Sequence, residues 1–172
     1  MKGFVVMEKI ALFEKVSRAV FAEAAADNPL FENTGSDKIY DDIAFPRRAT
    51  KGSAGYDFFS PCDIDLKAGE TILIPTGIRA KIAEGWVLMM FPRSGLGFKY
   101  RIRLENTVGI IDSDYYGADN EGHIMIKMTN EGSKEAFVKK GSGFAQGIFL
   151  PYGITADDEA DALRTGGFGS TG

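Results

Sequence analysis

The sequence predicts an all-β domain, either a barrel or a sandwich, with the jelly roll as one form of it. Between residues 78 and 128, apolar side chains recur at every second position in several short segments, which is the period of a half-buried strand. Turn segments that contain glycine separate them, for example residues 67–70, 84–85 and 130–132. Many short strands joined by close turns are typical of these all-β architectures.

The strands are expected at the following places. Residues 10–16 are a candidate first strand, and residues 78–82 alternate between apolar and basic side chains. Every residue from 86 to 91 is apolar, which predicts a strand buried on both faces. Residues 124–128 alternate again and form a further candidate strand.

The chain divides into a head (residues 1–45), a strand-rich body (46–163) and a glycine-rich tail (164–172), which we expect to form one domain. In the head, residues 17–27 are rich in alanine and predict a short helix with Ser17 as its N-cap. Residues 28–42 are polar and contain proline and glycine, which predicts a loop.

The composition limits the possible chemistry. A chain of 172 residues with 44% hydrophobic residues can form a domain with a substantial core. The net charge of −4 argues against a general nucleic-acid binder. Because the chain has one cysteine and one histidine, a zinc cluster or a histidine triad within it lacks partners. If the protein is an enzyme, we expect a carboxylate to be its base.

The chain shows no sign of a membrane address. It contains no apolar segment long enough to cross a bilayer. Residues 1–10 lack the long apolar stretch of a signal peptide. We therefore expect no membrane partner and a cytoplasmic location.

Residues 92–97 (PRSGLG) follow the most apolar predicted strand and contain the side chains of an anion site. Arginine supplies a fork of donors, serine a hydroxyl, and glycine lets backbone N–H groups approach a phosphate. The alternative is a simple strand-ending turn. Nearby Arg101 and Arg103 would share one face of a strand, as part of the anion site or as a solvated face.

Two further segments carry carboxylates. In residues 106–115 (NTVGIIDSDY), Asp112 follows two isoleucines, so it could orient and deprotonate a water at a pocket wall. The alternative is a hairpin in which Asp112 and Asp114 cap the turn. In residues 53–57 (SAGYD), small residues before Asp57 suggest a close approach of two backbones, or a turn.

Taken together, five segments resemble, in order, the five motifs of the trimeric dUTPase family (deoxyuridine 5′-triphosphate nucleotidohydrolases). The resemblance covers residues 46–172, and the order makes it specific although each segment alone is weak. The segments are residues 54–57, 92–97, 109–115 with Asn106 before them, 143–146 and 166–172.

The resemblance implies a jelly-roll-like β-barrel that forms a homotrimer, here with a short N-terminal helical insertion. Its active sites would lie between subunits, and the tail would be a flexible lid that becomes ordered over bound nucleotide. It also implies hydrolysis of dUTP to dUMP and pyrophosphate with Mg²⁺, which limits uracil in DNA and supplies dUMP for dTMP synthesis.

The resemblance also implies residue roles. Asp112 matches the general base, and Gln146 would contact the α-phosphate region or the attacking water. Asp57 would hold a metal-bound water or orient Arg93. The expected substrate-binding residues are those for the phosphates (Arg93, Ser94, Gly95, Arg164), for uracil (Asn106, Gly109, Ile110, Ile111, Met125), for deoxyribose (Tyr115) and in the lid (Phe168, Gly169, Ser170).

Three features depart from the family pattern, and two other functions remain open. The spacing before Gly166 is one residue short, the turn at residues 116–122 is long, and the insertion at 17–27 is unusual. A dCTP deaminase shares this fold, but Lys127 occupies the position of its proton-transferring glutamate. A non-catalytic nucleotide-binding or signalling protein is the other alternative.

Overall fold

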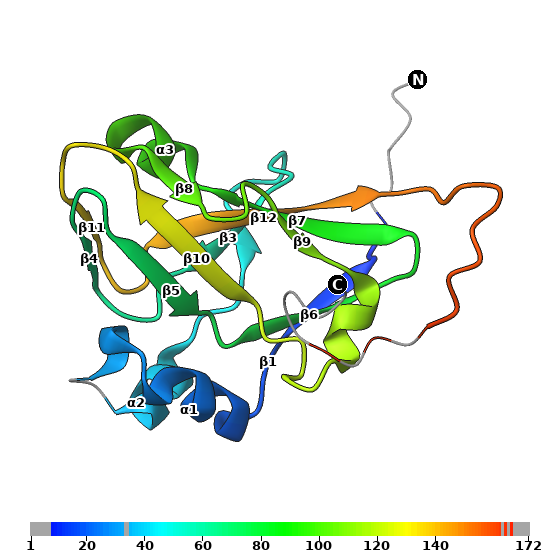
Figure 1. Cartoon of the computed structure of the whole chain (residues 1–172), viewed down its shortest axis with the longest axis horizontal. Coiled ribbons are helices and arrows are strands. Elements are labelled where there is room, and N and C mark those ends of the chain that lie inside the picture. The colour runs from blue at the N-terminus through cyan, green and yellow to red at the C-terminus, as the bar shows by residue number, and fades with distance from the viewer. Residues whose placement is uncertain (1–7, 33–34, 163, 165, 167–172) are drawn as a thin grey trace.

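The structure is a computed structural model that describes residues 8–32, 35–162, 164 and 166. It consists mostly of β-strands, with the helical part of the head to one side (Figure 1). The strands are β1 (Ala11–Lys15), β2 (Arg47–Arg48), β3 (Tyr56–Phe59), β4 (Ile64–Leu66), β5 (Thr71–Pro75), β6 (Ile78–Ile82), β7 (Trp86–Pro92), β8 (Ile102–Leu104), β9 (Gly109–Ile111), β10 (Met125–Asn130), β11 (Ala136–Val138) and β12 (Gly143–Pro151). The helices are α1 (Arg18–Ala26), α2 (Ser36–Asp42) and α3 (Ser94–Tyr100), and the 3₁₀ turns are η1 (Pro29–Phe31) and η2 (Ser113–Gly117). None of the described helices has the length and apolar character needed to span a membrane.

The strands form four antiparallel sheets. The largest has the order β2-β3-β12-β7-β9, a second has the order β5-β10-β8, and β1-β6 and β4-β11 are two-stranded. The prediction of a β-rich fold is therefore confirmed. The strands of the described residues do not close into a barrel, because the short outer strands β2 and β9 have no second partner there.

The centre of the largest sheet is packed tightly. Leu88 and Met90 of β7 are fully buried in the shared core, whereas the alternate side chains of this strand are half-buried. The predicted burial of both faces is thus only partly met. Beside β7, a Cβ added to Gly147 of β12 would lie 2.7 Å from Leu88 Cδ1 and 3.1 Å from the Met90 sulfur. Glycine at this position therefore lets the two strands fill the core without overpacking.

The head contains more helix than predicted. Helix α1 begins after Ser17, whose Oγ accepts a hydrogen bond from the Val20 N–H at 3.3 Å, so the predicted helix and its cap are confirmed. The prediction of a loop at residues 28–42 is wrong, because η1 and α2 lie there. The segment buries Phe31 and Ile39, and such tertiary packing stabilises a helix that propensity alone would not.

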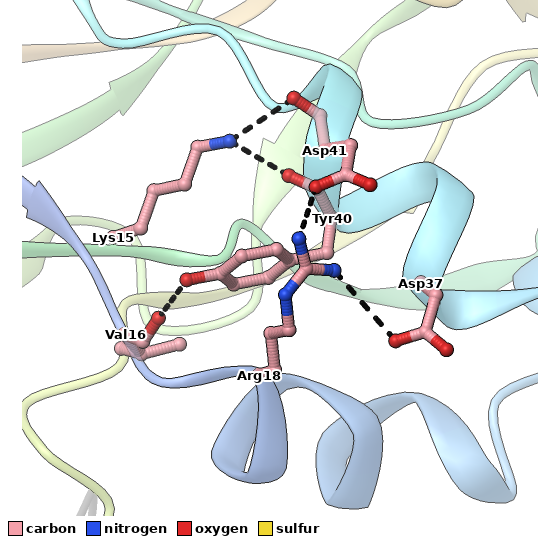
Figure 2. A network of polar contacts seen from close by, with 6 residues as sticks. All are labelled: Lys15, Val16, Arg18, Asp37, Tyr40 and Asp41. Carbon is pink, nitrogen blue, oxygen red and sulfur yellow. Dashed lines mark hydrogen bonds and ion pairs between the residues drawn. The ribbon is translucent and has the colours of Figure 1, made fainter.

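A polar network fixes α2 against β1 and α1 (Figure 2). The Lys15 ammonium donates to the carbonyl groups of Tyr40 at 2.7 Å and Asp41 at 3.2 Å, at the end of α2. A cation is favourable there, because the last carbonyl groups of a helix lack partners within it. The Tyr40 hydroxyl donates to the Val16 carbonyl at 2.7 Å, and Arg18 pairs with Asp41.

The head meets the body at Gly77 and His123. Gly77 has a φ of +69°, and a Cβ there would overlap Ile43 Cδ1 and lie 3.2 Å from Phe21 Cδ2. Its N–H donates to Nε2 of His123 at 2.8 Å, and the His123 ring centroid lies 6.2 Å from that of Phe21. Burial lowers the pKa of His123 to about 4, although the nearby Glu121 carboxylate acts in the opposite direction. His123 is therefore a neutral acceptor in the folded protein at neutral pH.

We expect His123 to make the fold sensitive to acid. Its pKa rises from about 4 in the folded state to 6.5 when exposed, so the unfolded state binds more protons between these values. The stabilisation is present above pH 6.5 and is lost as the pH falls toward 4. Between pH 7.5 and pH 5, urea titrations at one protein concentration should show a loss of about 2 kcal/mol in the free energy of unfolding from this residue. His123→Gln keeps an acceptor but does not titrate. Between the same pH values, the free energy of unfolding of this variant should therefore fall by about 2 kcal/mol less than that of the wild type. Equal losses in the two proteins would contradict this account.

Candidate active site

Three of the predicted site residues, Asp57, Arg93 and Gln146, meet at one end of the largest sheet; we call them the arginine cluster. The strand β12 places Gln146 opposite Asp57 of β3 on one side and opposite Phe91 of β7 on the other. The Arg93 Nε lies 3.5 Å from Asp57 Oδ1. The Asp57 side chain is 15% exposed and that of Arg93 is 44% exposed. A largely buried carboxylate thus orients a guanidinium that can still bind an anion from solvent.

Two glycines of the predicted motifs make room for this cluster. A Cβ on Gly55 would lie 2.7 Å from the Gln146 Oε1, and one on Gly143 would lie 2.7 Å from the Arg93 Nη1. The sequence predicted a close approach of two backbones near Gly55. The structure corrects this: the group that approaches Gly55 is the side chain of Gln146.

The segment after Arg93 is a helix, so the alternative of a simple strand-ending turn is wrong. Ser94 and Gly95 begin α3, and amide groups in the first turn of a helix have no acceptor within it. The backbone N–H groups of Ser94 and Gly95 can therefore bind an anion beside Arg93. Arg101 ends α3 with a φ of +59° and does not share a strand with Arg103, as was predicted. Arg103 pairs with Glu131 at 2.8 Å instead.

A cavity of about 400 Å³ lies between β9, β10 and the end of β8; we call it the hairpin cavity. Four predicted site residues line it, namely Asn106, Gly109, Ile111 and Met125. A Cβ on Gly109 would lie 3.0 Å from the Met90 Cβ, so glycine allows β9 to approach β7 closely. The other lining residues are Leu73, Met90, Leu104, Glu105, Asn120, Ile124, Ile126 and Lys127.

The backbone between the lining residues Asn106 and Gly109 of the hairpin cavity is tightly turned. Thr107 has a φ of +64°, and the Val108 N–H donates to the Asn106 carbonyl at 2.6 Å. The side chain of Ile110 is 45% exposed and does not line the cavity, because β9 alternates and directs its neighbours inward. Ile110 can therefore contribute to this site only through its backbone.

Asp112 follows β9 and lies next to the tail residue Arg164. Its Oδ2 is 3.0 Å from the Arg164 Nη1, and the Asp114 Oδ1 is 3.5 Å from the same nitrogen. Asp112 occupies the N-cap position of η2 without a side-chain capping bond, so the capping alternative is not what the structure shows. The predicted lid residues Phe168, Gly169 and Ser170 lie outside the described residues.

Tyr115 is buried, lies close to Asp112 in the sequence and belongs to a hydrogen-bonded chain. The Arg164 guanidinium lies 4.9 Å from its ring centroid. The Tyr115 hydroxyl donates to the His123 carbonyl and accepts from the Asn120 Nδ2, both at 2.8 Å. Burial raises the pKa of Tyr115, and the bond from Asn120 lowers it. Sequence reasoning missed Asn120, because its position near Gly122 signals only a turn.

The arginine cluster and Asp112 lie far apart within one chain. Ile111 pairs with Leu88, and Gly109 pairs with Met90, so β9 runs away from Arg93 as it approaches Asp112. Leu88 is five residues before Arg93, which is about 17 Å along an extended strand. Figure 1 accordingly shows α3, which follows Arg93, remote from the short lime-coloured helix η2 that follows Asp112. The two groups of predicted site residues therefore lie apart in one chain. We call the arginine cluster one half-site, and Asp112 with its neighbours Asp114 and Arg164 the other.

The described residues offer no ready-made metal cage. Within residues 8–32, 35–162, 164 and 166, no group of three or more His, Cys, Asp or Glu side chains could hold a metal ion. The acidic side chains nearest to the half-sites are Asp57 in one and Asp112 with Asp114 in the other.

Comparisons with known proteins agree on one family. The dUTPase family model matches residues 41–172. The chain is 44% identical over 133 residues to the deoxyuridine 5′-triphosphate nucleotidohydrolase of Lactococcus lactis, covering 76% of this chain and 89% of that protein. It is 39% identical over 143 residues to the protein of the same name from Pectobacterium carotovorum, covering 78% and 91%.

Solved structures give the same result. The crystal structure of dUTPase from Streptococcus mutans superposes with a TM-score of 0.59 at 36% identity, covering 67% of this chain and 90% of that one. The dUTPase from phage phi11 of Staphylococcus aureus superposes with a TM-score of 0.62 at 19% identity, covering 90% of this chain and 98% of that one, which supports the fold alone. The family match spans most of the chain and contains both half-sites, so the chain belongs to the dUTPase family.

Proposed function

We propose that this protein is a homotrimeric, Mg²⁺-dependent dUTP diphosphatase that hydrolyses dUTP to dUMP and pyrophosphate. The observation that carries the proposal is the hairpin cavity, whose lining residue Ile111 directly precedes Asp112 in the sequence. Family membership supplies the substrate: the relatives at 39–44% identity are deoxyuridine 5′-triphosphate nucleotidohydrolases.

Uracil recognition is assigned to the hairpin cavity. Its volume of about 400 Å³ suits a small ligand. The backbone groups of Gly109 and Ile110 would read the uracil edge, with Asn106 supporting the hairpin and Ile111 and Met125 forming the wall. The tight turn at Thr107 leaves little freedom to accommodate a 5-methyl group, which supports rejection of thymine. Cytosine would present a donor where uracil presents an acceptor, and such unpaired buried groups discriminate strongly.

Asp112 is proposed to orient a water and accept its proton as the water attacks the α-phosphorus. The P–O bond to the β-phosphate then breaks, and pyrophosphate leaves. The carboxylate is exposed and lies at the end of β9, which supports access of a water. Arg164, 3.0 Å away, places positive charge where the phosphate would carry negative charge. Gln146 would contact the α-phosphate region or the water.

Binding of the phosphates is assigned to Arg93, Ser94 and Gly95. Adjacent phosphates of one nucleotide are only a few ångström apart, whereas Ile111, the residue before Asp112, pairs with Leu88, about 17 Å along the strand from Arg93. A single dUTP could therefore contact both groups only if they come from different subunits. This separation supports a trimer with shared sites, in which Phe168, Gly169 and Ser170 of the tail would cover the base.

The residues present fit an ion held mainly by the substrate. Mg²⁺ keeps much of its hydration and binds triphosphate oxygens readily, so it needs no cluster of protein ligands. When bound, it would offset the charge that develops on the phosphates. Asp57, beside Arg93, would contact it through a water. A solved structure of a point mutant of the phi11 phage dUTPase reveals the coordination of a structural Mg(II) ion in that protein.

In the cell, this activity would limit uracil in DNA and supply dUMP for dTMP synthesis. A cytoplasmic location suits that role. The reaction involves free nucleotide, so it needs neither nucleic acid nor membrane as partner.

The proposed function is tested by product analysis with dUTP, dCTP, dTTP and UTP, each incubated separately with the protein and Mg²⁺. We expect dUMP and pyrophosphate from dUTP alone. A deaminated product from dCTP would establish the sister activity instead. Absence of turnover with all four, while the protein still binds a nucleotide, would indicate a binding or signalling role.

Asp112→Asn should bind dUTP but lose most of its turnover, because the amide cannot accept the proton from water. Loss of a general base lowers kcat by at least about a hundredfold. Asp119→Asn is the matched control, since it removes one exposed carboxylate from the same region. Steady-state kinetics and calorimetric binding measure the two effects. Normal turnover by Asp112→Asn would eliminate Asp112 as the base.

Gly143→Ala should weaken catalysis while leaving the fold intact. The added Cβ would meet the Arg93 side chain at 2.7–3.0 Å, and this half-exposed side chain can move away. A displaced guanidinium loses charge-assisted bonds to phosphate, so kcat/KM for dUTP should fall by about tenfold. Gly52→Ala, where nothing lies within 4 Å of the added atom, is the control. A Gly143→Ala protein with unchanged kcat/KM would show that the position of Arg93 is unimportant.

A further inference from the structure

The long turn at residues 116–122 lies between the hairpin cavity and the head, and the proposed function gives it no role. We infer that Asn120 in this turn is a positioning residue that fixes Tyr115 and thereby sets discrimination between deoxyribose and ribose, and that the head braces the turn through Glu121. This inference rests on the proposed function and on the role that the dUTPase resemblance gives Tyr115, which is to pack against the deoxyribose.

Asn120 contacts both the cavity and the tyrosine. It lines the hairpin cavity, together with Gly109 and Asn106. Its Nδ2 donates to the Tyr115 hydroxyl at 2.8 Å, and its Oδ1 accepts from the Gly122 N–H at 3.2 Å. The same hydroxyl donates to the His123 carbonyl at 2.8 Å. The hydroxyl of the tyrosine is therefore bonded to Asn120 in the turn and to His123 directly after it.

The turn is packed against the backbone of the residue it holds. Gly122 has a φ of +70°, and a Cβ there would lie 2.6 Å from the Tyr115 carbonyl oxygen. The Ala118 N–H donates to that oxygen at 3.1 Å. Any displacement of the turn would consequently move Tyr115 as well.

The head holds the turn at its far end. The Glu121 Oε2 accepts the backbone N–H of Ser17, the N-cap residue of α1, at 2.7 Å. This bond lowers the pKa of Glu121, so the carboxylate is ionised at neutral pH. A carboxylate at the start of a helix is favourable, because the N-terminal amides carry partial positive charge.

A second contact holds the beginning of the turn to β1 of the head and to its partner strand β6. The Tyr116 hydroxyl donates to Glu14 of β1 at 2.5 Å, and Arg79 of β6 pairs with the same carboxylate oxygen at 3.1 Å. The Arg79 guanidinium lies 4.3 Å from the Tyr116 ring centroid. The turn is thus anchored through Tyr116 to β1 and through Glu121 to the start of α1.

This bracing has a consequence for specificity. A wall rejects a ribose only if it cannot yield to the added 2′-hydroxyl group, so the rigidity of the supporting residues determines the selectivity. A Tyr115 ring that loses its bonds can shift and make room. Loss of Asn120 should therefore raise kcat/KM for UTP more than it changes kcat/KM for dUTP.

The test compares kcat/KM for dUTP and UTP in the wild type, Asn120→Ala, Tyr115→Phe and the double variant. Removal of the bond should lower the dUTP/UTP ratio by about fivefold in Asn120→Ala. Because both residues act through the hydroxyl, Asn120→Ala should have no further effect in the Tyr115→Phe background. If Asn120→Ala does not fold, Tyr115→Phe removes the same bond and must itself lower the ratio.

Glu121→Ala tests the brace from the head, because it removes the acceptor of the Ser17 N–H. Asp119→Ala, which removes a neighbouring exposed carboxylate, is the control. The ratio should fall in Glu121→Ala and stay at the wild-type value in Asp119→Ala. An unchanged ratio in Asn120→Ala and Tyr115→Phe would overturn the inference while leaving dUTP hydrolysis established. Failure of the wild type to hydrolyse dUTP would instead overturn the proposed function and the inference with it.

Discussion

The register of β7 against its two neighbours determines where Arg93, Gln146 and Asp112 lie. β12 pairs with the whole length of β7 and brings Gln146 next to Phe91, near Arg93. β9 pairs with β7 over three residues and delivers Asp112 toward the opposite end. A shift of one residue would turn each side chain to the other face of the sheet, so both half-sites depend on this pairing. The same pairing keeps them apart within a single chain.

The second constraint is the way in which glycines bring side chains together. Gly55 and Gly143 leave space for the side chains of Gln146 and Arg93, and Gly77 admits Ile43 and Phe21 of the head. These contacts connect segments that are distant in sequence. The head is thereby joined to the body beside His123, and its helix α1 reaches Glu121 in the turn that holds Tyr115. The insertion at residues 17–27 lies outside the family match at residues 41–172, and Ser17 connects it to the turn that holds Tyr115.

Local patterns predicted α1 and the strands β1, β6, β7 and β10, because alternation and capping are properties of neighbouring residues. They did not predict α2, whose Ile39 becomes buried only through packing against the rest of the head. They also placed Arg101 on a strand, whereas it ends α3 in a left-handed conformation. The ordered motifs identified four of the twelve residues that line the hairpin cavity. Asn120 was missed because its role depends on a contact with Tyr115 that no local pattern encodes.

The central claim is that an active site combines Arg93 of one subunit with Asp112 of another. It is tested by dissociating and reassembling an equal mixture of Arg93→Ala and Asp112→Asn proteins, each of which should be nearly inactive alone. If the sites are shared and the subunits assort randomly, about a quarter of the sites will contain both native residues, and a corresponding share of wild-type dUTP hydrolysis should return. A mixture that remains as inactive as its components, while wild-type protein survives the same procedure, would contradict the claim.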